Sequence, residues 1–124
     1  MSPMAGDPDF EKALSRLPHG PQFRFLDRLL GLDPGKSGVA EYTVRDELFL
    51  RGHFPGNPLF PGVLLVEAAA QLAGVVAQSD PANPPLPGLK LTAIRGVKIF
   101  GTAKPGEVIR VEAKVTGRLG GLVQ

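Results

Sequence analysis

Apolar and polar residues alternate along two segments of the chain, residues 38–45 and residues 108–115. A period of two is typical of a strand that has one face in a core and the other in water. Residues 89–100 also favour a strand, and residues 23–32 lean the same way. The pattern therefore predicts several antiparallel strands.

One segment, residues 63–78, is apolar on almost every side and predicts the one long helix of the chain, about 24 Å in length. A shorter helix is expected over residues 9–17, where apolar residues recur at helical spacing before Pro18. A helix that is apolar all round must be covered all round. A curved antiparallel sheet wrapped around the long helix meets that need, so we expect an α+β fold and a single domain over residues 1–124.

Proline and glycine cluster at the borders of these elements. Residues 46–62 predict an irregular loop, and residues 79–88 hold too many prolines to join a helix or a sheet ladder. Asp33-Pro34-Gly35 predicts a turn. This clustering is typical of turns and loops in a folded domain.

Composition narrows the functional classes. The 124 residues carry a formal net charge of +2, from 14 basic and 12 acidic residues, and the basic residues are scattered. With seven Phe, one Tyr and no Trp, the chain lacks both the clustered basic face and the stacking surface of a nucleic-acid-binding protein. It has no cysteine for a disulfide or a thiol nucleophile. No segment predicts a signal peptide or a membrane span, so we expect a soluble cytoplasmic protein.

A single carboxylate, Glu67, interrupts the apolar helix expected over residues 63–78. An ionised carboxylate is costly to bury, so Glu67 should be harder to ionise there, which suits a proton donor near neutral pH. Gln71 follows one helical turn later and can hydrogen-bond to Glu67. Pro61 and Gly62 stand where the helix begins, and the backbone N–H groups there can stabilise a carbonyl that gains negative charge.

His53 belongs to the loop before this helix, and glycines and prolines let the loop fold back so that His53 nears the helix start. A histidine close to a carboxylate favours proton-transfer chemistry. Taken alone, His53 is more often a surface histidine, and Glu67 alone could simply pair with a basic group. Together they favour catalysis. We read His19 as structural, a contact at a helix end, and two distant histidines without cysteine argue against a metal site.

Residues 52–71 read Gly-His-Phe-Pro-Gly-Asn-Pro-Leu-Phe-Pro-Gly-Val-Leu-Leu-Val-Glu-Ala-Ala-Ala-Gln. This stretch resembles the active-site motif of the beta-hydroxyacyl-(acyl-carrier-protein) dehydratases of type II fatty acid synthesis. The segments Leu17-Pro18-His19, Val97-Lys98-Ile99-Phe100 and Pro105-Gly106-Glu107 are also similar to that family. The resemblance implies a hot-dog fold, an antiparallel sheet wrapped around a central helix. A glutamate at position 67 implies the dehydratase-only branch.

The resemblance also implies the roles of the site residues. His53 is the base that removes a proton from the carbon beside the thioester, and Glu67 is the acid that helps the beta-hydroxyl leave as water. The Gly62 N–H holds the thioester carbonyl. Other residues implied to bind substrate are Phe54, Pro61, Val63 and Gln71. No metal and no dissociable cofactor are expected.

The implied substrate is an acyl chain on the phosphopantetheine arm of acyl carrier protein. Lys98 and Lys104 could meet that acidic carrier. In the family the histidine and the acid come from different subunits, which implies a homodimer with shared active sites and, as a further step of assembly, a trimer of dimers. No nucleic acid and no membrane are expected as partners.

Two positions depart from the family pattern. Pro21 stands where many members have an aromatic residue that gates the acyl tunnel, so chain-length preference is left open. The chain stops at Gln124, where the family continues into further strand, so we expect the C-terminal strand region to be short or truncated.

Two alternative functions use the same residues. One is a hot-dog acyl thioesterase, in which Glu67 activates water; His53 in its Gly-His-Phe-Pro context argues against it. The other is a non-catalytic dehydratase-like subunit, against which the intact pair of His53 and Glu67 argues.

Overall fold

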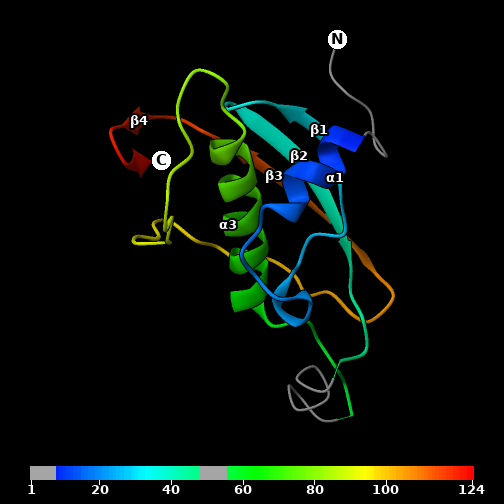
Figure 1. Cartoon of the computed structure of the whole chain (residues 1–124). Helices are drawn as coiled ribbons and strands as arrows, with labels where there is room; N and C mark the ends of the chain where they lie inside the picture. Colours follow the sequence, from blue (N-terminus) through cyan, green and yellow to red (C-terminus); the bar gives the residue numbers. More distant parts are fainter. Residues whose placement is uncertain (1–7, 48–55) are drawn as a thin grey trace.

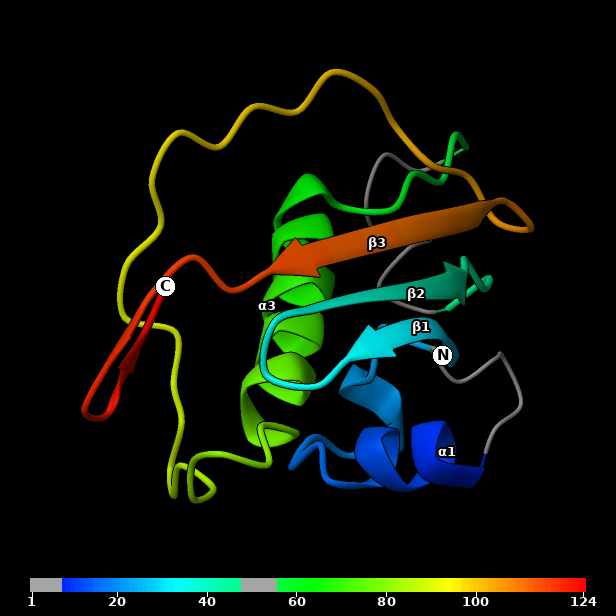
Figure 2. The same ribbon diagram turned by 90° about the horizontal axis from the view of Figure 1, so that it is seen from above.

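The computed structural model describes residues 8–47 and 56–124. An antiparallel sheet of three strands packs against one long helix, α3 (Gly62–Gln78), as Figures 1 and 2 show. In spatial order, the strands are β1 (Arg28–Asp33), β2 (Ser37–Thr43) and β3 (Val108–Lys114). The smaller elements are α1 (Pro8–Ser15), the 3-10 turn η1 (Pro21–Phe23), and the strand pair β4 (Arg118–Leu119) and β5 (Leu122–Val123).

Most of the expected elements are confirmed. The helix expected over residues 63–78 begins one residue earlier, and the one expected over residues 9–17 ends at Ser15. The strands expected over residues 38–45 and 108–115 pair with each other as β2 and β3. Of residues 23–32, only the later part is a strand, because η1 and an extended stretch come first.

The alternation along β2 and β3 explains their place in the fold. Ala40 and Tyr42 are buried on the face of β2 that meets the core, and they lie opposite Val111 and Ile109 of β3. Their neighbours along the strands are more exposed, as a half-solvated sheet requires. The predicted antiparallel sheet with one solvated face is therefore confirmed.

The core lies between the sheet and one side of α3. Leu72 and Val76 of the helix are fully buried. A Cβ on Gly38 of β2 would lie 2.9 Å from Val76 Cγ2, so this glycine lets helix and strand approach closely. Burying a side chain such as Leu72 stabilises the fold by about 1.5–3 kcal/mol.

The prediction of a strand over residues 89–100 is wrong. These residues are described, and none of them is in a strand. They run outside the sheet, in the yellow and orange trace of Figure 2, with Leu91, Ile94 and Val97 half-exposed and Phe100 93% exposed. A strand needs a hydrogen-bonded neighbour, and in the described part of this chain none lies alongside.

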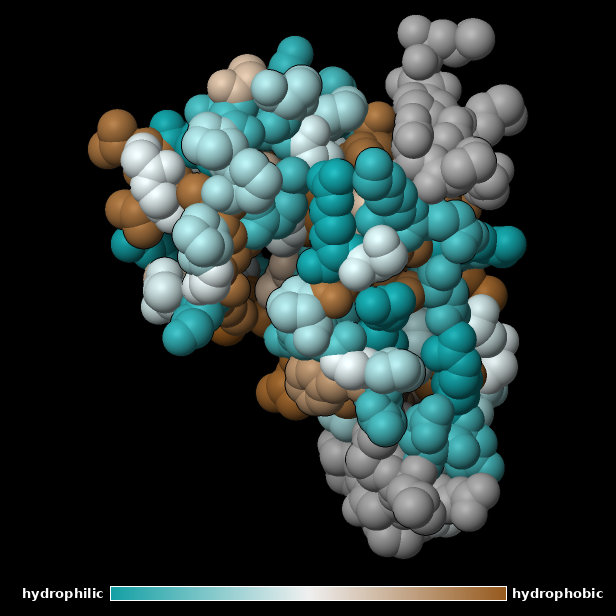
Figure 3. Space-filling model, viewed as in Figure 1, coloured by the Kyte–Doolittle hydropathy of each residue, from teal (hydrophilic) through white to brown (hydrophobic). Residues whose placement is uncertain are grey.

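The expectation that α3 is covered on every side is also only partly met. Val63 is 74% exposed, and Ala69 and Ala73 are exposed as well. The sheet therefore covers one side of the helix. Figure 3 shows further apolar surface on the side of the molecule that carries β4, where Leu119 and Leu122 are exposed.

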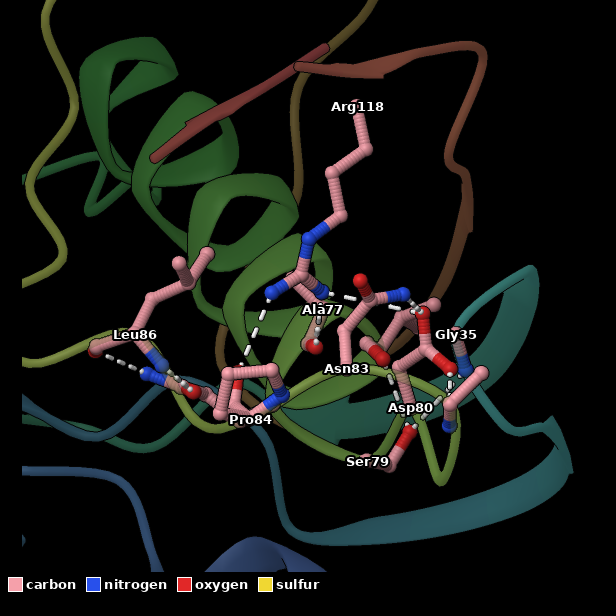
Figure 4. Close-up of polar contacts among 11 residues, drawn as sticks. Gly35, Ala77, Ser79, Asp80, Asn83, Pro84, Leu86 and Arg118 are labelled. Atoms are coloured by element: carbon pink, nitrogen blue, oxygen red, sulfur yellow. Dashed lines mark hydrogen bonds and ion pairs between the residues drawn. The ribbon is translucent and has the colours of Figure 1, made fainter. Parts of the chain in front are cut away.

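Side-chain hydrogen bonds hold the loop after α3, which is neither helix nor strand, as expected for residues 79–88. Gln78 both donates to the Leu86 carbonyl, at 2.6 Å, and accepts from the Leu86 N–H, at 2.7 Å (Figure 4). Arg118 donates to the Pro84 carbonyl at 3.1 Å and lies 3.6 Å from Asp80. The C-terminal end of α3, the loop and the β4–β5 pair are thereby joined.

Asp80 lies near the start of this loop, and its carboxyl group has a lowered pKa. It accepts hydrogen bonds from the backbone N–H of Ala82, at 2.8 Å, and from the side chain of Asn83, at 2.7 Å. These bonds lower the pKa of the Asp80 carboxyl, since each of them favours the ionised form.

Within the described part of the chain, no helix combines the length and the apolar character needed to cross a membrane.

Candidate functional site

The N-terminus of α3 is the first part of the site. Pro61 is its N-cap residue and offers no side chain to the first helical N–H groups, while its carbonyl accepts from Leu64 N at 2.9 Å. Gly62 and Val63 follow as the first helical residues, and Val63 is largely exposed. This end of the helix has the two features that bind a partly negative oxygen: N–H groups without a capping side chain and the positive end of the helix dipole.

Gly62 is in close contact with a residue far along the chain. A Cβ at this position would lie 2.6 Å from Ile99 Cδ1. The lack of a side chain at Gly62 therefore lets the segment that contains Ile99, residues 89–100, pass over the helix start. The sequence suggested a different reason for this glycine, the approach of a substrate, and that reason stays a prediction.

Glu67 lies one turn further along α3, on the side that faces the N-terminal segment. Its side chain is 24% exposed, so the carboxylate is not enclosed in apolar surroundings as the sequence suggested. A polar group also lies against the carboxylate, because Gln71 Nε2 is 3.1 Å from Glu67 Oε1. The expected hydrogen bond between Glu67 and Gln71 is confirmed.

Gln71 is buried and connects α3 to the chain segment before β1. Besides Glu67, its Nε2 donates to the Phe23 carbonyl at 2.8 Å, and its Oε1 accepts from Phe25 N at 2.9 Å. Both ends of the amide thus bond to the protein, which fixes the side chain and explains how a polar group can be 2% exposed. Substrate binding by Gln71 stays a prediction.

His19 contacts a different place from the one expected. The sequence predicted a structural histidine at a helix end, but its Nε2 lies 3.2 Å from Glu67 Oε1, within α3. Its ring stacks on Phe23, with centroids 6.1 Å apart. Sequence reasoning missed this contact because the two residues are distant in the chain. The available signal was the Leu17-Pro18-His19 element itself, in which proline turns the chain after α1.

An aromatic cluster fixes the loop that leads into α3. Phe60, just before the helix, packs edge-on against Phe25 with centroids 5.6 Å apart, and its ring is tilted against that of Tyr42 with centroids 5.5 Å apart. Its N–H donates to the Ala103 carbonyl at 2.7 Å. Burial raises the pKa of the Tyr42 phenol, so this ring stays neutral. The cluster therefore holds the helix start in a fixed place relative to the sheet.

Pro61, Gly62 and Val63 thus lie at the start of α3, and Glu67 and Gln71 follow one and two turns after Val63. His53 and Phe54 lie outside the described residues, so their expected places near the helix stay predictions. Among the residues that are described, no three His, Cys, Asp or Glu side chains gather where they could bind a metal.

Comparisons with known proteins give this arrangement a context. Residues 17–121 match the family model of the FabA-like domain. A protein of Roseiflexus castenholzii, named "3-hydroxyacyl-[acyl-carrier-protein] dehydratase FabZ", is 37% identical over 107 residues, which are 86% of this chain and 74% of the relative. Proteins of the same name from Bacillus pumilus and Acetivibrio thermocellus are 39% and 40% identical, over 87% and 79% of this chain and 75% and 67% of the relatives.

Proposed function

The chain belongs to the FabA-like family, and we propose on that basis that it is a 3-hydroxyacyl-(acyl-carrier-protein) dehydratase of fatty acid synthesis. It removes water from a beta-hydroxyacyl thioester and releases the trans-2-enoyl thioester. The observation that carries the proposal is the placement of Glu67. Its carboxylate is partly exposed, is held by Gln71, and lies one turn from the uncapped start of α3.

The proposed chemistry uses one base, one acid and one backbone donor. His53 takes the proton from the carbon beside the thioester carbonyl, and the electron pair of that C–H bond forms the new double bond. Glu67 gives its proton to the beta-hydroxyl as the C–O bond breaks, so the hydroxyl leaves as water. The Gly62 N–H stabilises the negative charge that develops on the thioester carbonyl.

The start of α3 supports this assignment for the carbonyl. Among the described residues no side chain caps this end of the helix, and the exposed Val63 beside Gly62 offers an apolar surface to an acyl chain. Phe54, Pro61 and Val63 are proposed to line that path. Of these, Pro61 and Val63 flank Gly62.

We further propose a homodimer with shared active sites, able to build a trimer of dimers. The support is the apolar surface that the single chain leaves exposed, namely Val63 on α3 and the half-exposed residues Leu91, Ile94 and Val97 of the segment after it. Exposed apolar surface is typical of protein–protein interfaces, which supports this proposal. Sedimentation velocity tests the proposal, and a monomer at micromolar concentration would contradict it.

The substrate carrier is proposed to be acyl carrier protein. Lys98 and Lys104 are both exposed and lie in the segment whose Ile99 contacts Gly62, so they stand near the proposed thioester site. Their positive charges suit an acidic partner. Replacing both with glutamate should raise the KM for acyl carrier protein substrates more than for the same acyl group on a small thiol.

We also propose that residues 1–124 act as a single domain, without a metal or dissociable cofactor, in the cytoplasm. A continuous buried cluster that reaches from Phe10 of α1 to Val111 of β3 supports the single domain. Activity that persists after extensive dialysis against a chelator would support the cofactor-free chemistry, and its loss would contradict it.

The direct test is incubation with a 3-hydroxyacyl thioester of acyl carrier protein, followed by mass spectrometry of the carrier. We expect loss of one water and a reverse reaction when the enoyl product is supplied. Glu67→Gln keeps the shape of the side chain and should abolish the mass change. Release of free carrier thiol would point instead to the thioesterase, and an unchanged carrier mass would contradict both reactions.

A further inference from the structure

Two nitrogen donors approach the same oxygen of Glu67. Gln71 Nε2 lies 3.1 Å from Oε1, and His19 Nε2 lies 3.2 Å from it. For the other oxygen, Oε2, the described part of the chain provides no partner. We propose that His19 is a positioning residue for the acid of the reaction, which holds Oε1 so that Oε2 is presented to the substrate.

His19 is held in place by the same segment that Gln71 binds. Its ring stacks on Phe23 with an interplanar angle of 29°. The Phe23 carbonyl accepts from Gln71 Nε2, and Phe25 N donates to Gln71 Oε1. The segment from His19 to Phe25 is thereby fixed against α3 at three points, two through Gln71 and one through the imidazole.

The surroundings of the imidazole select one tautomer. His19 Nδ1 is buried, and the described residues give it no hydrogen-bond partner. A protonated Nδ1 would leave a buried donor unsatisfied, which costs more than an unsatisfied acceptor of a neutral ring. The proton of neutral His19 is therefore on Nε2, and this N–H donates to Glu67.

The consequence for catalysis rests on the proposed dehydratase function. When Oε2 gives its proton to the beta-hydroxyl, the C–O bond breaks, its electron pair stays with the departing oxygen, and water leaves. The carboxylate that remains carries a full negative charge. The N–H groups of His19 and Gln71 already point at Oε1, so they stabilise this charge without reorganisation.

The contact explains why His19 should matter more for turnover than for binding. A donor lost from an oxyanion site costs about 10²–10³ in kcat. Because His19 acts through Glu67 and not on the substrate, we expect His19→Leu to lower kcat by about 10- to 100-fold with little change in KM. His19→Gln offers an amide N–H in place of the imidazole Nε2–H and should restore most of the loss.

The kinetic test compares these two variants with the wild type on one enoyl thioester, with thermal unfolding measured alongside. Turnover by His19→Leu at the wild-type rate would overturn the proposal. Equal losses in folded His19→Leu and His19→Gln would also overturn it, because only a donor role predicts rescue by the amide.

A second measurement needs no activity and remains decisive if His19→Leu fails to fold. The chain has only two histidines, so 15N-labelled histidine gives signals from two imidazole rings, two nitrogens each, and His53→Ala assigns them. We expect the His19 signals to show an Nε2–H tautomer and to shift in Glu67→Gln. Unchanged His19 signals in Glu67→Gln would overturn the proposal.

The two measurements separate this proposal from the proposed function. If the wild type turns over no acyl thioester but the His19 signals respond to Glu67→Gln, the dehydratase function fails while the contact is supported. If the wild type is active and the His19 signals do not respond, the dehydratase function stands and the positioning role fails.

Discussion

Gln71 Nε2 donates to two acceptors at once, the Phe23 carbonyl at 2.8 Å and Glu67 Oε1 at 3.1 Å. The orientation of the proposed catalytic acid therefore depends on the packing of a backbone segment that is distant in sequence. A buried side chain that is fully hydrogen-bonded tolerates little movement, so this link is stiff.

Replacing Gln71 with leucine should lower both the stability of the protein and its activity. We expect a loss of about 1–3 kcal/mol in the free energy of unfolding, because hydrogen bonds to buried backbone groups are broken. We also expect a lower kcat, because Glu67 loses a donor. Urea unfolding and steady-state kinetics measure the two effects.

Gln78→Leu is the matched control for that variant. Gln78 makes two backbone hydrogen bonds as well, but to Leu86 at the opposite end of α3. Gln78→Leu should loosen the loop of residues 79–88 and leave kcat unchanged. Equal effects of the two variants on kcat would contradict the role given to Gln71.

Gly62→Ala should affect activity more than stability, which distinguishes a role of Gly62 in binding the thioester from a role in packing. The new Cβ would lie 2.6 Å from Ile99 Cδ1, but this atom is the tip of a half-exposed side chain and can move aside. We therefore expect a cost in stability of about 1 kcal/mol, at the low end for overpacking. Activity should fall much further, because the methyl group stands beside the N–H proposed to bind the thioester carbonyl.

Ile99→Ala in the Gly62→Ala background tests that separation. The second change should restore thermal stability without restoring activity. Recovery of activity together with stability would show that Gly62 serves packing alone.

Asp80 should make the stability of the loop after α3 depend on pH. Hydrogen bonds from Ala82 N–H and Asn83 lower the pKa of Asp80 in the folded state. Its contribution is therefore present above the ordinary aspartate pKa of about 4 and is lost as the pH falls through the lower folded value. Asp80→Asn should be less stable than the wild type at neutral pH, and the difference should shrink in acid. Denaturant titrations across this pH range check it, and a difference that grows in acid would contradict the account.

Replacing Phe100 tests whether the exposed apolar residues of segment 89–100 lie in a dimer interface. Its side chain is 93% exposed in the single chain, so Phe100→Ser should change the stability of an isolated monomer by less than about 0.5 kcal/mol. If the segment lies in a dimer interface, the same change should shift dimer dissociation to higher protein concentration. Lys98→Ser, in the same segment and also exposed, is the control. Analytical ultracentrifugation over a concentration series measures the shift.

The sequence predicted those parts of the structure whose cause is local. The apolar run that forms α3 and the alternation in β2 and β3 are periodic patterns that need no knowledge of distant contacts. The hydrogen bond between Glu67 and Gln71 follows from helical spacing for the same reason.

Features that depend on distant segments were not predictable in this way. Residues 89–100 have a strand-like composition, but a strand also requires a paired neighbour, and the pattern within the segment cannot supply one. The contact of His19 with Glu67 was not predicted because it arises only when the segment before β1 packs on α3. The covering of α3 was overestimated because the sheet beside it has three strands in the described residues and leaves Val63 exposed.

We propose that this chain carries out dehydratase chemistry with His53 as base. The most direct measurement is hydration of a short trans-2-enoyl thioester, the reverse reaction, followed by the loss of the absorbance of the conjugated enoyl group. Wild type and His53→Ala are compared at equal concentration, with circular dichroism to show that both are folded. We expect loss of absorbance in the wild type and a rate lower by at least about 10²-fold in His53→Ala. Equal rates in the two proteins, or no reaction in a folded wild type, would contradict it.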